Sequence, residues 1–376
     1  MKFVLFYHSV LSDWNHGNAH FLRGIATELL ARGHQVRIFE PGNSWSAENL
    51  MAEHGWEPFR RFHEVYPMLE ASRYDPATLD LDLVLDGADV VLVHEWNEPR
   101  LVSQIGRHRR VNGDYRLFFH DTHHRMVTNP QAMSKYDLAN YDGVLAYGRV
   151  LQELYEQSGR VARAWTWHEA ADTRVFHPWP EKRGEGDLIW VGNWGDGERT
   201  AELMEFLLEP SQRLRLKTRI CGVRYPEAAR KMLDECGIDY SGWLPNFEVP
   251  PAFARFRVTV HVPRRPYVQA LPGIPTIRPF EALACGIPLI CSPWEDVEGL
   301  FSPGEDYLVA QNGREMERHL QAVLQDPDLR RELIRNGLRT IQARHTCAHR
   351  VNELLAIEAA LRAAKPIPAA EEVSLL

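Results

Sequence analysis

The sequence lacks the features of a membrane protein and of a disulfide-bonded exported protein. Its 376 residues contain no uninterrupted apolar run of about 18, the length that a membrane helix needs. The five cysteines are odd in number and none forms a CxxC pair, so neither a disulfide framework nor a structural zinc site is expected. The apolar start, Met1–Tyr7, has no small-residue cleavage site and reads as a buried strand. We therefore expect a cytoplasmic protein.

Positive charge is also scarce. The chain has 43 Lys and Arg against 51 Asp and Glu, which gives a formal net charge of −8. Duplex binding depends on many cationic contacts to phosphates, so nucleic acid is not expected as a partner. A short basic run such as Arg107–Arg110 could hold a small anion, but such runs are more often solvated surface. Nothing in the sequence fixes the oligomeric state.

What the sequence does contain is strand–helix alternation, twice over. The first series has predicted strands at 3–7, 36–39, 89–93, 115–119 and 144–147, with helices at 19–32 and 150–157. The second has strands at 188–191, 216–221, 258–262, 288–291 and 307–310, with helices at 200–208, 227–235, 279–284 and 316–324. Continuous apolar strands of this kind are buried in parallel sheets. The pattern predicts an α/β protein with two Rossmann-like, doubly wound parallel-sheet domains and a ligand cleft at the strands' carboxyl ends.

The most informative stretch is RPFEALACGIPLI at 278–290. Pro279 suits the first turn of a helix, Gly286 ends that helix, and a strand follows. The positive helix start, backed by Arg278, is a suitable seat for a diphosphate. Glu281, which we place in the first turn, could accept hydrogen bonds from a ribose diol, or it could simply complement the helix dipole. The residues alone favour neither interpretation.

This block, followed by DVEGLF at 296–301 and GE at 304–305, resembles the donor-site region of family-4-type retaining glycosyltransferases. It is most similar to their spore-maturation (CgeB-like) branch. Three further segments resemble family motifs in the family's order: ADTRVFHP at 171–178, GWLPN at 242–246, and a helix from His345 to Leu355. The resemblance implies the GT-B fold, in which two Rossmann-like domains face a central cleft. It also implies that Glu281 binds the nucleotide ribose.

The resemblance further implies an organisation and an activity. Residues 1–170 would form an acceptor domain and 171–345 a nucleotide-sugar donor domain, with a hinge in the Pro/Gly-rich segment 178–186. Residues 346–362 would form a helix that crosses back to the first domain, ahead of a frayed tail at 363–376. The expected reaction moves a sugar from a UDP- or GDP-type donor, which is a substrate, to an unidentified saccharide, protein or small molecule. Retention of configuration and independence from metals and cofactors are expected.

One position departs from the family pattern. The family usually carries an acidic residue eight positions before the ribose glutamate, where it contacts the donor sugar, and here that position is Gly273. Backbone N–H groups of the loop with Ile274 and Thr276 could still meet the sugar or phosphate. The missing acid keeps an inverting mechanism open, with Asp13, His16 or Asp121 as base. A sugar-nucleotide epimerase and a non-catalytic nucleotide- or sugar-binding protein are the alternative functions.

Two loops of the second series are candidate donor contacts. The turn WVGNWGDGERT at 190–200 joins a strand to a helix, and its glycines would let the backbone approach a phosphate. Tight turns need glycine in any case, so the signal is weak by itself. Position and resemblance together favour pyrophosphate contacts from Gly192, Asn193, Trp194 and Arg199. The segment at 242–246 resembles the family's loop under the nucleobase, which implies contacts from Trp243 and Leu244.

Two loops of the first series are candidates for the reacting centre. Gly17 and Asn18 follow the first strand, where they would line the cleft, although Asn18 could be a plain helix cap. The run HDTHHR at 120–125 follows the fourth predicted strand, and the family commonly has a His-Asp pair there. We expect His120 and Asp121 to face the sugar or acceptor. The spacing of the three histidines does not favour a metal site.

Overall fold

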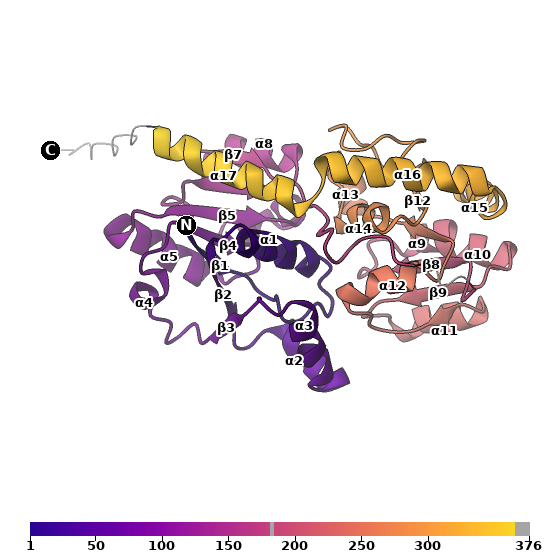
Figure 1. Cartoon of the computed structure of the whole chain (residues 1–376), viewed down its shortest axis with the longest axis horizontal. Helices are drawn as coiled ribbons and strands as arrows, with labels where there is room; N and C mark the ends of the chain where they lie inside the picture. The colour runs from indigo at the N-terminus through magenta and orange to yellow at the C-terminus, as the bar shows by residue number, and fades with distance from the viewer. Residues whose placement is uncertain (181–183, 365–376) are drawn as a thin grey trace.

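The computed structural model describes residues 1–180 and 184–364, and within them the chain forms two α/β domains that lie side by side (Figure 1). The hinge predicted at 178–186 includes 181–183, which lie outside the described residues. Most of the predicted tail, from residue 365 onward, lies outside them as well. The chain passes from the first sheet to the second between residues 166 and 188.

The first domain is built on a seven-stranded parallel sheet with the order β3-β2-β1-β4-β5-β6-β7. Its strands are β1 (Lys2–Phe6), β2 (Gln35–Pro41), β3 (Ala71–Tyr74), β4 (Val90–His94), β5 (Arg116–Asp121), β6 (Gly143–Ala146) and β7 (Ala164–Thr166). The central strands are buried throughout, which explains their continuous apolar sequences. The five predicted strands are all present. The two edge strands, β3 and β7, were not predicted.

The second domain has a six-stranded parallel sheet with the order β10-β9-β8-β11-β12-β13. Its strands are β8 (Leu188–Val191), β9 (Thr218–Cys221), β10 (Asp239–Tyr240), β11 (Val258–His261), β12 (Leu289–Cys291) and β13 (Leu308–Val309). All five predicted strands are present, and only the two-residue edge strand β10 was not expected. The prediction of two doubly wound parallel-sheet domains is therefore confirmed.

Helices cover both faces of each sheet. In the first domain they are α1 (Ala19–Ala31), α2 (Trp45–His54), α3 (Glu57–Val65), α4 (Leu81–Leu85), α5 (Pro99–Asn112), α6 (Arg125–Thr128), α7 (Pro130–Met133) and α8 (Arg149–Ser158). In the second they are α9 (Thr200–Leu203), the π-helix η1 (Met204–Leu208), α10 (Glu209–Arg213), α11 (Glu227–Glu235), the 3₁₀ turn η2 (Asn246–Glu248), α12 (Val249–Phe253), α13 (Arg265–Gln269), α14 (Ile277–Cys285), α15 (Gly313–Gln325) and α16 (Pro327–Arg344).

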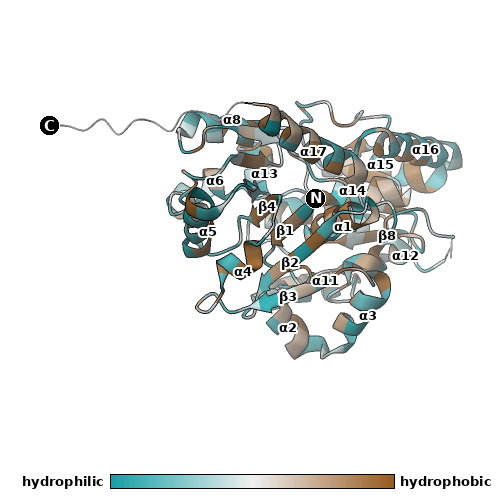
Figure 2. Cartoon of the chain, turned by 60° about the vertical axis from the view of Figure 1, so that its left-hand side comes forward, coloured by the Kyte–Doolittle hydropathy of each residue, from teal (hydrophilic) through white to brown (hydrophobic). Residues whose placement is uncertain are grey.

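The last helix, α17 (Cys347–Ala363), leaves the second domain and packs against α1 of the first (Figure 1). Its buried residues Val351, Leu354 and Leu361 belong to the same hydrophobic cluster as Phe21 and Leu22 of α1. The other face of the first sheet is covered by α4, α5 and α8. Figure 2 shows the hydrophobic central strands enclosed by helices with hydrophilic outer faces. No helix in the described part of the chain is long and apolar enough to cross a membrane.

Candidate functional site in the cleft between the sheets

A cavity of about 800 Å³ lies between the two domains, where the carboxyl ends of both sheets meet. In the first domain it is lined by residues that follow all seven strands. In the second it is lined by the loops that follow β8, β9, β10 and β11, and by the start of α14. Parallel α/β sheets bind ligands at these strand ends. The cleft predicted from the sequence is therefore present.

Charge is unevenly divided between the two walls of this cavity. Four arginines line it, and all four come from the second domain: Arg199, Arg224, Arg264 and Arg278. Among the described residues of the first domain, no Arg or Lys lines the cavity. Two of the arginines are ion-paired with cavity acids, Arg224 with Asp196 at 2.8 Å and Arg264 with Glu198 at 3.1 Å. The second-domain wall is thus a cationic surface suited to an anion.

Among the four cavity arginines, Arg199 has the least negative charge beside it. Its guanidinium donates hydrogen bonds to the carbonyl oxygens of Val262, at 2.8 Å, and Asn193, and it has no carboxylate partner among the described residues. Burial, and after it the nearby charges of Arg264 and Arg278, lower the pKa of Arg199 to about 10. An arginine in this environment is short of negative charge, and a phosphate group would supply it.

The glycine-rich turn after β8 lies beside Arg199 as predicted, but only part of it faces the cavity. Gly192 and Asn193 line the cavity wall. The Asn193 amide donates to Asn15 Oδ1 of the first domain at 2.6 Å and accepts from the Val223 backbone at 3.0 Å. Trp194, in contrast, turns into the hydrophobic core and donates from Nε1 to Thr200 Oγ1 at 3.1 Å. The sequence therefore predicted the turn correctly but not the direction of Trp194.

The loop after β1 bridges both domains. Asp13 is buried and forms an ion pair with Arg23 of α1 at 2.8 Å. The same carboxylate accepts hydrogen bonds from Trp243 Nε1, at 3.0 Å, and from the Asn246 backbone, at 2.9 Å. Trp243 and Leu244, predicted to lie under a nucleobase, line the cavity beside this loop. Asp13 thus links the two domains at one side of the cavity.

Gly17 and Asn18, at the end of this loop, both line the cavity. Gly17 faces the second domain: a Cβ built on it would lie 3.4 Å from Ile277 and 3.6 Å from the Arg278 guanidinium. Asn18 precedes α1 but its side chain makes no helix cap, and its amide donates to the carboxylate of Glu169 instead. The simple capping role considered for Asn18 is thus wrong.

Glu281 lies directly behind the cavity wall. Its carboxylate is fully buried, pairs with His20 Nδ1 at 3.0 Å and accepts a hydrogen bond from Arg278. His20 Nε2 accepts the Asp172 backbone N–H at 2.8 Å, which assigns the proton of the ring to Nδ1. Because α14 begins at Ile277, Glu281 falls in the second helical turn. The prediction that it lies in the first turn is therefore wrong. A dipole-complementing role there is correspondingly weak.

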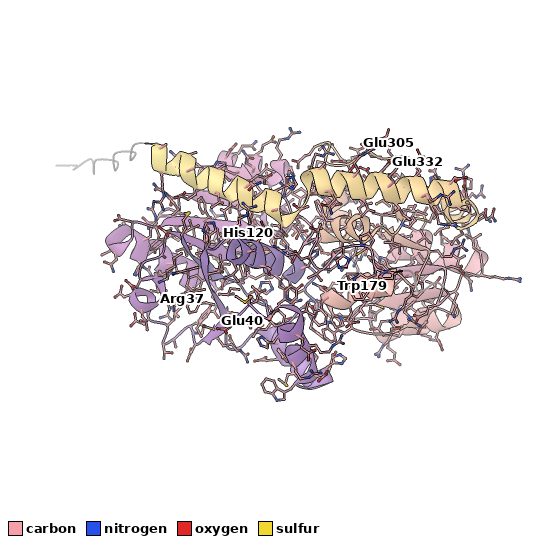
Figure 3. All side chains as sticks on the ribbon, viewed as in Figure 1. Arg37, Glu40, His120, Trp179, Glu305 and Glu332 are labelled. Carbon is pink, nitrogen blue, oxygen red and sulfur yellow. The ribbon has the colours of Figure 1, made fainter. Side chains whose placement is uncertain are left out.

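His120 and Asp121 do not line the cavity. His120 lies within the first domain (Figure 3). Its ring packs against Phe21 and Trp167, with ring centroids 5.9 and 4.9 Å away. Burial lowers the pKa of His120 to about 3. Asp121 accepts from Tyr155 Oη at 2.6 Å, and burial raises its pKa to about 6. The prediction that both side chains face a substrate does not match their positions.

The reason is the length of β5, which continues to Asp121, two residues beyond its predicted end. The polar residues that reach the cavity are the next three, Thr122, His123 and His124. Two more histidines, His8 and His16, line the same wall, with ring centroids 4.0 Å apart. Burial lowers the pKa of all four imidazoles, so they are neutral at physiological pH. This neutral, hydrogen-bonding wall was not foreseen.

The loop around Gly273 also lies away from the cavity. Gly273 has φ of +84°, and a Cβ on it would lie 2.6 Å from Val297 Cγ2. Ile274 is buried in the first-domain core cluster. Thr276 does line the cavity, and its hydroxyl contacts His261 Nε2 at 3.1 Å. Across the described residues, no group of three or more His, Cys, Asp or Glu is placed to hold a metal ion.

One buried cavity carboxylate was missed altogether. Glu169 follows β7, lines the cavity and is 4% exposed. Nothing in the sequence marks it, because its approach to Asn18 depends on the packing of β7 beside β6 and on the loop after β1. Of the predicted donor residues, the structure thus brings together Arg278, Arg199, Gly192, Asn193, Thr276, Trp243 and Leu244, with Gly17 and Asn18 facing them.

Part of the sequence matches a known protein family, and the whole fold matches solved structures. Residues 199–356 match a family model described as "Glycosyl transferase-like". No curated protein matches the chain in sequence. Solved structures match over nearly the whole chain, at low identity.

Three of these structures illustrate the likeness. Sucrose-phosphate synthase from Thermosynechococcus elongatus is 15% identical, with 97% of this chain and 100% of that chain covered and a TM-score of 0.65. An alpha-glucosyltransferase in complex with UDP is 10% identical, with 96% and 100% covered and a TM-score of 0.70. HepE from Anabaena, in complex with UDP and glucose, is 11% identical, with 96% and 100% covered and a TM-score of 0.63.

At such identities the solved structures establish the fold, and the family model adds the glycosyltransferase-like sequence of the second domain. Fold and family match together support the prediction of a glycosyltransferase enzyme. The chain thus has the GT-B fold, and its residues 199–356 match the glycosyl transferase-like family model.

Proposed function

We propose that the chain transfers a glycosyl group from a nucleotide-diphosphate sugar, bound on the second domain, to an acceptor bound against the first. The observation that carries this proposal is the division of charge in the cavity. All four cavity arginines belong to one wall, and neutral imidazoles and amides make up much of the other. A donor with two phosphates fits the first wall, and a hydroxylated acceptor fits the second.

The donor would lie along the second domain. Arg199, Arg264 and Arg278 would bind the diphosphate, assisted by the N-terminus of α14, where backbone N–H groups and the helix dipole favour anions. Trp243 and Leu244 would form the flat apolar surface for the base. Uridine is the proposed base, with guanosine as the alternative, because neighbours of the same fold bind UDP.

The reaction we propose retains the configuration of the sugar and needs no metal. When the glycosyl bond breaks, negative charge develops on the leaving diphosphate, and fixed guanidinium groups in a water-excluded site stabilise it. The bridging loop at 13–18 would limit the entry of water, which competes with the acceptor. The block at 278–290 also leads us to place the chain in the CgeB-like branch.

The experiment is calorimetric titration of the protein with UDP, GDP, dTDP and CMP, followed by assay of nucleotide release from the matching sugar conjugates. The release assay is run with EDTA and with added Mg²⁺. Arg264→Met serves as the site variant, and Arg335→Met, an exposed arginine on α16, is the matched control.

Binding of one nucleoside diphosphate, weakened by Arg264→Met but not by Arg335→Met, would support the proposal. Equal release with and without EDTA would support independence from metals. If none of the four nucleotides binds at millimolar concentration, the proposed donor site is wrong. Binding that Arg264→Met leaves unchanged would place the nucleotide elsewhere.

A further inference from the structure

Five carboxylates line the cavity, and four of them already have a partner or face solvent. Asp13 is held by Arg23, Asp196 by Arg224, and Glu198 by Arg264. Glu98 lies at the N-terminus of α5 and is exposed. The fifth, Glu169, is buried, and none of the described residues forms an ion pair with it.

Glu169 is oriented by one hydrogen bond, which its Oε1 accepts from the Asn18 amide. Among the described residues, no other donor reaches the carboxyl group. Burial is the main cause that raises the pKa of Glu169 to about 8, and this value already includes the lowering by the Asn18 hydrogen bond and the raising by the charge of Glu281. Near neutral pH the group is therefore mostly a neutral carboxylic acid, which can both donate and accept a hydrogen bond.

The position of Glu169 is on the border between the two walls of the cavity. Its charge interacts with that of Arg278, the cation at the start of α14. Gly17, the neighbour of Asn18, faces the same arginine. A diphosphate bound by the second-domain arginines would therefore extend its attached group toward Asn18 and Glu169.

We propose that Glu169 binds the hydroxyl groups of the sugar that the donor carries, with Asn18 as the residue that positions it. The inference rests on the proposed function, because it needs a nucleotide sugar in the cavity. A carboxyl group with one free donor and one free acceptor suits a pair of neighbouring hydroxyls. It would supply from the first domain a contact that Gly273 cannot make, since the space beside Gly273 is filled by Val297 and Glu298.

The experiment compares the affinity for a nucleotide with the affinity for its sugar conjugate. Dissociation constants are measured for UDP and UDP-glucose, and for GDP and GDP-mannose, with wild type, Glu169→Gln and Glu169→Ala. Glu169→Gln keeps the shape and the acceptor for Asn18, so it is expected to fold. Glu98→Gln removes a cavity carboxylate that is exposed, and is the matched control.

The expected result is an unchanged affinity for the free nucleotide and an affinity for the sugar conjugate that falls about tenfold or more in Glu169→Ala, the scale of one or two lost hydrogen bonds. Glu169→Gln is expected to lose less, because its amide still donates and accepts. Equal losses for nucleotide and conjugate, or no loss for either, would overturn the assignment of Glu169 to the sugar. If wild type binds neither nucleotide, the proposed function fails and this inference fails with it.

Discussion

We expect replacement of Arg199 by methionine to weaken nucleotide binding but to leave the free energy of unfolding almost unchanged. Burial is the main cause that lowers the pKa of Arg199 to about 10, well below its ordinary value. At about 1.4 kcal/mol per pKa unit, the charged side chain costs the folded state roughly 3 kcal/mol. Methionine keeps much of the volume and removes this cost, but it also removes the two hydrogen bonds to carbonyl oxygens, each about 1.5 kcal/mol. The two effects nearly cancel.

We therefore expect the free energy of unfolding of Arg199→Met to lie within about 1 kcal/mol of wild type. Affinity for a nucleoside diphosphate should fall much more, because a guanidinium–phosphate hydrogen bond contributes about 1.5–3 kcal/mol in a dry site. This corresponds to a loss of roughly 10- to 100-fold. Stability and binding are thus expected to respond very differently to one substitution.

The assay pairs urea unfolding, followed by tryptophan fluorescence, with calorimetric titration of UDP and GDP. Arg335→Met, on the exposed side of α16, is the control for removal of an arginine in general. A loss of 3 kcal/mol or more in Arg199→Met would show that the arginine is a structural support. An unchanged nucleotide affinity would show that the cationic wall does not bind the diphosphate. Either result would refute the reasoning.

Three further predictions concern stability. Asp13→Ala leaves a buried arginine unpaired and should lower the free energy of unfolding by about 3–5 kcal/mol in urea titrations, and a loss under 1 kcal/mol would contradict this. The pKa of Glu169 is about 8 in the folded protein and about 4.5 in the unfolded chain, so the unfolded chain releases this proton first and the free energy of unfolding should fall as pH rises between these values. Glu169→Gln should therefore gain stability relative to wild type between pH 5 and pH 8. A stability difference that stays constant with pH would refute the assigned shift. Gly273→Ala should lower the thermal midpoint more than Gly33→Ala does, because both glycines have positive φ but only at Gly273 would a Cβ press against Val297. Equal losses would show that the loop around Gly273 shifts to make room for the Cβ.

The fold was largely predictable because the central strands of both sheets are buried on both faces. Continuous apolar runs such as those of β4 and β8 have few other stable arrangements. The edge strands escaped prediction for the same physical reason. β3 has the sequence ASRY with two exposed positions, and β10 has only two residues. Edge strands carry less apolar sequence because one side of each has no neighbouring strand.

The site was predictable only where local sequence determines local geometry. Arg278 at a helix start and the glycine turn before Arg199 are fixed by nearby residues, and both face the cavity. The position of His120 was predicted wrongly because β5 ends two residues later than expected, so His120 lies within the buried strand and not in the loop after it. Glu169 could not be found from the sequence, because the partner that orients it is about 150 residues away along the chain.

The α17 helix has a consequence for the order in which the protein folds during synthesis. Its residues Cys347, Val351 and Leu354 complete a hydrophobic cluster whose other members include β1 and α1 of the first domain. On the ribosome, that face of the first domain stays uncovered while the entire second domain is being made. Domains usually fold as they emerge, from the N-terminus onward. Here the domain made first reaches its final packing only after the one made second, so a nascent chain stalled before Cys347 should expose an apolar face that chaperones bind.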